Sequence, residues 1–293
     1  MVRNTIFDPM LFINDSDWKV EQKQIEFMNH LINNITIIDK YNITKIYWTD
    51  ELESLVWSPL PPWRSNRDYN NLLSPIFYKF RSNNIILIKC NKDHGECSVI
   101  PKMYFSRDDI RDCFLNTIHL IIERKEEVFL CLGLKNNLTN DPYCFDCDCH
   151  ENKLVPILIK KCFDWYDHID LNNFWSKSDC KVEKIVEGIE IIRIKDFSST
   201  PLLYNFIFSP GFIKDLMNAD ENKYEILKNI TRRLVLNSNE ARQDIILKEE
   251  YLEQSKEYRF RINFKSRVHI RFLSDKEIKF LHYYGPGEHD KGL

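Results

Sequence analysis

The sequence of 293 residues has little glycine, only seven residues, and it lacks internal repeats and low-complexity segments. No run approaches the roughly 18 uninterrupted apolar residues that a membrane-spanning helix needs. The start of the chain also lacks the basic segment, apolar run and small-residue cleavage site of a secretory signal. We therefore expect a cytoplasmic protein with no membrane partner, and 43% apolar residues provide ample material for a core.

Neither sign of charge is in large excess, because the formal net charge is only -3. This excludes a histone-like polycation. The charges are unevenly distributed, however, with eight basic and three acidic residues between Lys256 and His282. Such local asymmetry indicates an anionic partner for the C-terminal part of the chain.

The same C-terminal stretch reads as three short strands in succession. Apolar residues recur at every second position, so one side of each strand is suited to a core. We expect the buried side to contain Tyr258, Phe260, Ile262, Phe264, Val268, Ile270, Phe272, Ile278 and Phe280. The connections are too short for crossover helices, so the strands should form an antiparallel meander with one open face.

The open face should carry the positive charge. We expect Arg259, Arg261, Arg267, His269, Arg271 and Lys279 to lie there. Planar guanidinium groups suit phosphate oxygens, so these six residues are the candidate phosphate and RNA contacts. The alternative interpretation is the ordinary solvated face of a small sheet. The end of the chain adds histidines and tyrosines that move protons near neutral pH or stack on bases.

The N-terminal two thirds favour an α/β domain, which we place at residues 1–196. A break at Lys195–Leu203 separates it from a second domain over residues 201–293. Hydrophobic patterns predict strands in Thr5–Phe12, Thr44–Trp48, Ile85–Lys89 and Glu127–Gly133, and helices over Trp18–Ile35, Arg107–Glu123 and Leu154–Trp165. The proline-containing stretch Trp57–Asn71 is predicted to be an ordered loop.

The second domain is predicted to contain a strand over Tyr204–Phe208, a helix capped by Ser209, a helix from Asp220 and then the three-stranded meander. In this order of elements it resembles the RelE/ParE superfamily of bacterial toxins. The segments that carry the resemblance are Phe206–Leu216, Tyr258–Ile262, Arg267–Ile270 and Glu288–Asp290. The resemblance covers about ninety residues and implies a RelE-like α+β fold.

RelE-like members cleave mRNA on the ribosome without a metal, so the resemblance implies a toxin-like endoribonuclease that needs no cofactor. Arg267 matches the phosphate-holding arginine of the nucleases, and Arg259 with Arg261 matches a basic pair. His282, Tyr283 or His289 would fill the final acid-base position. The alternative is a non-catalytic ParE-like binding module. An antitoxin or a defence-system partner would restrain such a domain, or the N-terminal half would do so in cis, and phage defence is one setting for it.

Two other groups of residues point to metals. The spacing Cys144-x-x-Cys147-x-Cys149-His150 is typical of zinc ligands. Cys90, His94 or Cys97 would complete such a site. The nine cysteines are an odd number in a chain expected to be cytoplasmic, which argues against a disulfide framework and leaves structural zinc or incidental free thiols.

Acidic residues also follow the first two predicted strands. Asp8 ends the first strand and Asp50 follows the second. A PIN-like nuclease gathers carboxylates at such strand ends to hold Mg²⁺. The alternative is ordinary loop and cap chemistry, because acidic residues are common at the ends of strands.

Overall fold

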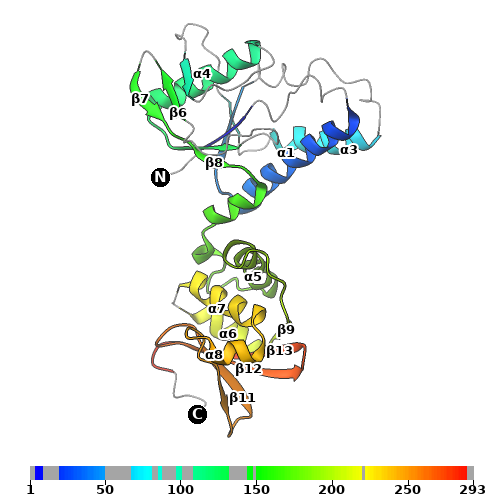
Figure 1. Cartoon of the computed structure of the whole chain (residues 1–293), viewed down its shortest axis with the longest axis vertical. Helices are drawn as coiled ribbons and strands as arrows, with labels where there is room; N and C mark the ends of the chain where they lie inside the picture. Colours follow the sequence, from blue (N-terminus) through cyan, green and yellow to red (C-terminus); the bar gives the residue numbers. More distant parts are fainter. Residues whose placement is uncertain are drawn as a thin grey trace. The chain divides into compact units, whose positions relative to one another are not determined.

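The computed structural model describes residues 4–8, 20–49, 67–80, 85–87, 97–100, 108–131, 144–147, 150–219 and 222–288. The chain forms two compact units, Met1–His168 and Ile169–Leu293 (Figure 1). This division differs from the boundary expected at Lys195–Leu203. The reason is that helix α5 (Val182–Asp196) belongs to the second unit, where it packs against helix α7 (Lys223–Val235).

The first unit is built on a parallel sheet in the strand order β3-β2-β1-β5-β8. Its strands are β1 (Asn4–Phe7), β2 (Lys45–Trp48), β3 (Ile85–Leu87), β5 (Val128–Cys131) and β8 (Ile157–Ile159). All four residues of β1 and of β5 are buried, as expected for central strands covered on both faces. The predicted α/β class is therefore confirmed for this unit.

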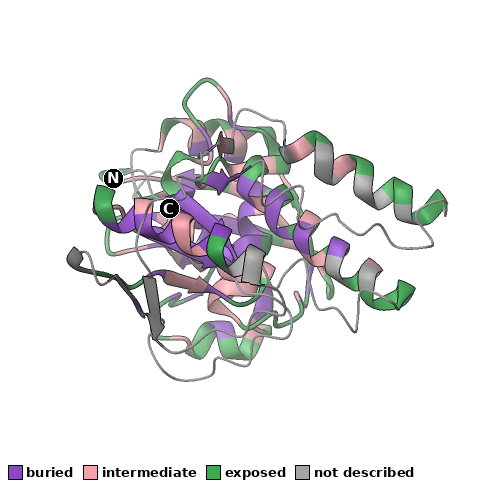
Figure 2. Cartoon of the chain, turned by 90° about the horizontal axis from the view of Figure 1, so that it is seen from above, coloured by how far each residue is buried: buried purple, intermediate pink, exposed green. Residues whose placement is uncertain are grey.

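Helices α1 (Glu21–Tyr41), α3 (Arg67–Phe80) and α4 (Asp108–Arg124) accompany the sheet. Apolar residues recur at helical spacing along α1, and Met28, Leu31 and Ile35 are all buried. Helix α4 supplies Phe114 and Ile118 to a core cluster that it shares with strands of the sheet. Figure 2 shows buried residues in the strands and along parts of the helices.

A small antiparallel sheet in the order β4-β6-β7 lies beside α4. Its strands are β4 (Cys97–Ile100), β6 (Cys144–Cys147) and β7 (His150–Leu154). The helix predicted over Leu154–Trp165 is wrong. Pro156 has no N–H to donate and separates β7 from β8, and a 3-10 helix, η4 (Cys162–His168), follows.

The loop predicted over Trp57–Asn71 needs a partial correction. Residues 67–71 belong to α3, which begins at Arg67 and contains Pro75. The remainder, residues 57–66, lies outside the described residues. In the part of the chain that the structure describes, no helix has the length and hydrophobicity required to cross a membrane.

The second unit carries a mixed sheet in the order β10-β11-β12-β13-β9. Its strands are β9 (Asn205–Phe208), β10 (Glu250–Leu252), β11 (Glu257–Arg261), β12 (Arg267–Ser274) and β13 (Glu277–Tyr284). Strands β11, β12 and β13 form the expected antiparallel meander. The first strand, β9, pairs in parallel with the last, β13.

Besides α5, helices α6 (Pro210–Asn218), α7 and α8 (Ser238–Gln243) and the 3-10 helix η5 (Leu171–Asn173) complete this unit. The predicted cap of α6 is confirmed, because the Ser209 side chain accepts a hydrogen bond from the Phe212 N–H at 3.0 Å. The start of α7 was predicted at Asp220, but Asn222 caps it and Lys223 begins it. Helix α8 and strand β10 were not predicted.

The core of the second unit lies between α6, α7 and one face of the sheet. Phe260, Val268, Ile270, Ile278 and Phe280 are fully buried there, as the alternation predicted. Phe264 was expected to join them but is 91% exposed. The reason is that β11 ends at Arg261 and the Asn263 side chain accepts hydrogen bonds from the Lys265 and Ser266 N–H groups, which turns the chain.

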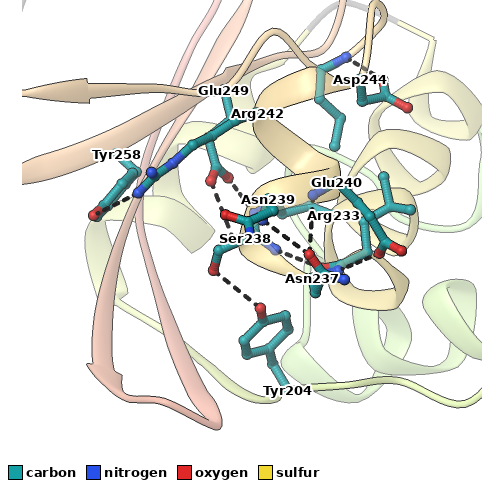
Figure 3. Close-up of polar contacts among 12 residues, drawn as sticks. Tyr204, Arg233, Asn237, Ser238, Asn239, Glu240, Arg242, Asp244, Glu249 and Tyr258 are labelled. Carbon is teal, nitrogen blue, oxygen red and sulfur yellow. Dashed lines mark hydrogen bonds and ion pairs between the residues drawn. The ribbon is translucent and has the colours of Figure 1, made fainter.

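A buried ion pair ties α7 to the start of strand β10. Arg233 and Glu249 have fully buried side chains and form a two-point contact (Figure 3). The Arg233 guanidinium also donates to the Leu236 carbonyl and lies over the rings of Tyr204 and Phe272. Strand β10 is thus connected to α7 by the ion pair of Glu249, the residue before the strand, and to β11 by backbone hydrogen bonds.

Candidate functional site

The open face of the second sheet presents its side chains in cross-strand rows. Residues that face one another across neighbouring strands lie on the same side of a sheet. One row reads Glu250, Arg259, His269 and His282, the next reads Arg261, Arg267 and Tyr284, and Arg271 with Lys279 forms a third. The structure therefore gathers all six expected basic residues and one of the three expected acid-base candidates.

Carboxylates divide the arginines into two kinds. Arg259 pairs with Glu250 at 2.6 Å, and Arg271 pairs with Glu257 at 3.1 Å. Sequence reasoning missed the first pair because strand β10, which carries Glu250, was not predicted. It missed the second because the pairing of Glu257 on β11 with Arg271 on β12 depends on contacts between strands that the sequence does not give. Their charges cancel those of their partners, so Arg259 and Arg271 attract an anion less than their number implies.

The row of Arg261 and Arg267 keeps its positive charge. Among the described residues, neither arginine forms an ion pair with a carboxylate. The Arg267 guanidinium instead donates to the carbonyls of Asn263 and Ser266 at 2.8 and 2.9 Å, which hold it in place without neutralising it. Burial lowers the pKa of Arg267, and the charges of Arg261 and Arg259 lower it further. An anion bound at this row would relieve that repulsion.

His282 lies half-exposed at the edge of this face, and its Nδ1 is 3.1 Å from Asp215 Oδ2 on α6. The same oxygen accepts the Tyr283 N–H at 3.1 Å. The contact arises because β9 pairs with β13 only as far as Phe280. Beyond that point α6 covers the free edge of β13, and the Ser209 hydroxyl donates to the Leu281 carbonyl at 2.6 Å.

Tyr284, which the sequence pattern did not single out, is the tyrosine on the open face. Its ring centroid lies 4.7 Å from that of His269 and 5.8 Å from that of His282. Burial raises the pKa of Tyr284, and the charges of Glu257, Asp215 and Glu288 raise it further. Its phenol therefore remains protonated at neutral pH and can donate a proton or a hydrogen bond.

Tyr283, the candidate chosen from sequence, is only 3% exposed and belongs to the buried side. The cause is an irregularity in β13. Ile270 faces Phe280 and His269 faces His282, so Leu281 is an extra residue and the alternation shifts by one. No signal in the sequence marks such a bulge. The third candidate, His289, lies outside the described residues.

His269 is on the expected face but is only 2% exposed. Its Nδ1 is 3.2 Å from Glu257 Oε2, and burial lowers its pKa in spite of that carboxylate. The neutral imidazole of His269 packs against the ring of Tyr284 and has no positive charge with which to bind a phosphate. The phosphate contact expected of His269 is therefore inconsistent with its burial.

The backbone of the small sheet brings part of the cysteine motif together. Cys97 is directly opposite Cys147 in the ladder of β4 and β6, and Cys147 is opposite His150 in the ladder of β6 and β7. Cys144 lies opposite Ile100. Cys149, Cys90 and His94 lie outside the described residues. Among the side chains that the structure describes, no group of three or more metal-binding residues was found.

Asp8 follows β1 at the carboxyl edge of the parallel sheet and is fully buried. Its N–H donates to the Cys131 carbonyl at 2.8 Å. The order β3-β2-β1-β5-β8 reverses direction between β1 and β5, which is where open α/β sheets bind ligands. Burial raises the pKa of the neighbouring Cys131 well above its ordinary value, and the Asp8 charge adds to this. Asp50, its expected partner, lies outside the described residues.

Comparison with known proteins adds no relative to these observations. No protein-family model matches the chain, and neither the curated proteins nor the solved structures contain a significant match to it.

Proposed function

We propose that the second unit is a RelE-like endoribonuclease that cleaves mRNA, with the help of the ribosome and without a metal. The observation that carries the proposal is the row of Arg261, Arg267 and Tyr284 with His282 beside it. Two guanidinium groups without a carboxylate partner among the described residues lie next to a half-exposed imidazole and a protonated phenol, which together provide both charge and proton transfer.

The chemistry requires three tasks. The 2′-hydroxyl must lose its proton as its oxygen attacks the phosphorus, the charge of the pentavalent phosphate must be held, and the leaving 5′-oxygen must gain a proton. His282 takes the first proton, Arg261 and Arg267 hold the charge, and the phenol of Tyr284 donates to the leaving oxygen. The products are a 2′,3′-cyclic phosphate and a 5′-hydroxyl end.

A toxin-like activity needs restraint in the cell that makes it. We propose a protein partner that covers the positive face, either an antitoxin or another component of a phage-defence system. The row of Arg261 and Arg267 is the part of the face that favours an acidic partner, because no carboxylate in the part of the chain that the structure describes pairs with it. Such a partner and RNA would compete for the same surface.

The test is cleavage of end-labelled RNA by the full chain, alone in EDTA and on translating ribosomes. Arg267→Ala and His282→Ala should each lower the rate about 100-fold or more, the usual cost of losing a charge-stabilising or proton-transfer group. Arg271→Ala is the matched control, because Glu257 already pairs with this arginine, and its effect should be much smaller. Retained binding of ribosomes without cleavage would favour the ParE-like binding module.

A second candidate is a PIN-like nuclease in the first unit, which is favoured by the position of Asp8 at the strand-order reversal. This activity would depend on Mg²⁺, which carboxylates such as Asp8 would hold and which would supply the positive charge that stabilises the reacting phosphate. Cleavage that EDTA abolishes, that Asp8→Asn lowers sharply and that His282→Ala leaves unchanged would identify it.

A further inference from the structure

The His282 imidazole is held from three sides. Asp215 lies against its Nδ1, Tyr284 flanks its ring at 5.8 Å with an interplanar angle of 37°, and Gly211 lies beneath it. Both Asp215 and Gly211 belong to α6, whose Ser209 is bonded to β13 through the Leu281 carbonyl. The helix and the strand that carry these groups are therefore fixed to one another.

The hydrogen bond to Asp215 determines which ring nitrogen carries the proton. An ionised carboxylate only accepts hydrogen bonds, so Nδ1 of a neutral His282 must be the donor. The lone pair of a neutral imidazole then lies on Nε2. Histidine in water favours the opposite tautomer, with the proton on Nε2, and that tautomer has no lone pair on Nε2 to accept a proton.

Gly211 leaves the space in which the ring lies. A Cβ built on this residue would be 2.9 Å from His282 Cε1 and 3.3 Å from Nδ1, so any larger residue would push the imidazole away from α6. The ring is the end of a side chain and can move, so the effect would fall on its position more than on stability. The residue is part of a regular helix, and its lack of a side chain serves this close approach.

We propose that Asp215 and Gly211 are positioning residues that hold His282 as the Nδ1–H tautomer, with Nε2 as the proton acceptor of the site. The proposal rests on the proposed function for its chemical purpose, but the tautomer is a property of the protein alone. Asp215 also accepts the Tyr283 N–H, so a purely structural role at the free edge of β13 is the competing explanation.

Asp215→Asn separates the two roles. The amide keeps a carbonyl oxygen that can accept the Tyr283 N–H, but it has no charge and can also donate to Nδ1. The full chain contains eight histidines, so selective ¹⁵N-histidine labelling with His282→Ala as the assignment variant identifies the ring signals of His282. Long-range ¹H–¹⁵N spectra report the tautomer directly, at a pH high enough that the His282 ring signals no longer change with pH.

We expect a protonated Nδ1 and a bare Nε2 in the wild type, and a shift toward the Nε2–H tautomer in Asp215→Asn with unchanged amide signals around Tyr283. Asp196→Asn is the matched control, because Asp196 accepts a hydrogen bond from Tyr224 and should not affect His282. A wild-type His282 with its proton on Nε2, or an unchanged tautomer in Asp215→Asn, would overturn the proposal.

Gly211→Ala tests independently whether the space beside Gly211 sets the position of the His282 ring. We expect displaced His282 ring signals and RNA cleavage lowered about tenfold to a hundredfold, the range typical of losing a group that orients another. Lys214→Ala, an exposed change on the same helix, should alter neither. If the tautomer is as expected but the wild type cleaves no RNA, the positioning stands and the proposed function fails. If RNA is cleaved and the His282 signals are identical in Gly211→Ala, the positioning role of Gly211 is refuted.

Discussion

The adjacent residues Glu249 and Glu250 allow a direct comparison of a buried and an exposed ion pair. Glu249 pairs with Arg233, and both side chains are completely buried. Glu250 pairs with Arg259 on the open face, and its side chain is 51% exposed. Because the two glutamates are neighbours in the chain, replacing either one alters the same strand terminus. Any difference between the two variants therefore reports the environment of the charge.

We expect Glu249→Ala to destabilise the second unit by about 3–5 kcal/mol, the usual cost of leaving a buried charge without its partner. After the change, the partners that Arg233 keeps among the described residues are the Leu236 carbonyl and the faces of Tyr204 and Phe272. The exposed pair should contribute about 1 kcal/mol or less, because water screens it, so Glu250→Ala should have a small effect.

Burial raises the pKa of Glu249 although Arg233 pulls it in the opposite direction. The burial cost of the carboxylate therefore exceeds the attraction of its partner, and the pair as a whole should contribute little net stability. Replacing both residues, as Arg233→Met with Glu249→Leu, should recover most of the loss caused by Glu249→Ala. The two changes are thus expected to be strongly non-additive.

Hydrogen exchange measured by mass spectrometry suits this chain, because it reports each compact unit separately. Peptides from β12 should exchange faster in Glu249→Ala by roughly two to three and a half orders of magnitude, since about 1.4 kcal/mol corresponds to a factor of ten. Peptides from the first unit serve as the internal control. Equal acceleration in Glu249→Ala and Glu250→Ala would refute the reasoning, as would a double variant less stable than Glu249→Ala.

Three further predictions concern the titrating groups, the helix packing and the cysteine motif. Burial lowers the pKa of His269, so the unfolded chain takes up a proton below about pH 6.5 that the folded unit does not. The stability present above that pH should therefore be lost as the pH falls. In His269→Gln, the midpoint of urea denaturation should change less over roughly pH 5–7 than in the wild type. Gly188→Ala should destabilise the second unit by about 1–3 kcal/mol in the same exchange experiment, because the new Cβ would lie 2.6 Å from Leu227 Cδ1, and an unchanged β12 exchange rate would contradict the packing of α5 on α7. If the ladder positions of Cys97, Cys147 and His150 form a zinc site, the purified chain should contain about one zinc per molecule by elemental analysis, and Cys147→Ser should lose it while Cys180→Ser, a buried thiol of the other unit, should not.

Sequence patterns predicted most elements of the second unit because each is encoded locally. Ser209 followed by Pro210 is a helix start in itself, and the alternation around Phe260 and Ile270 identifies a buried face. The same alternation predicts which residues lie on the open face. It does not predict how they pair, because Glu250 reaches Arg259 through an unpredicted strand, and Asp215 reaches His282 across a long separation in sequence.

The errors have equally local causes. The extra residue Leu281 places Tyr283 on the buried side of the sheet and Tyr284 on the open face. The alternation of apolar and polar residues gives no sign of such an insertion. In the first unit, Pro156 divides a short apolar stretch into two strands where a helix was expected, because short apolar runs do not distinguish the two. The parallel strand order could not be derived from the sequence, since it depends on pairings such as that of β1 with β5.

The parallel pairing of β9 with β13 also has a consequence for biosynthesis. Strand β9 lies at the edge of its sheet, with β13 as its neighbour, and β13 leaves the ribosome only after every other strand of the unit. Until then β9 has no partner, α6 has no strand edge to cover, and His282 has not yet been made. Pairing between such distant segments is slow to form because a long loop must close first. The open face is therefore assembled in one late step. While the chain is still being translated, the site that contains His282 is incomplete.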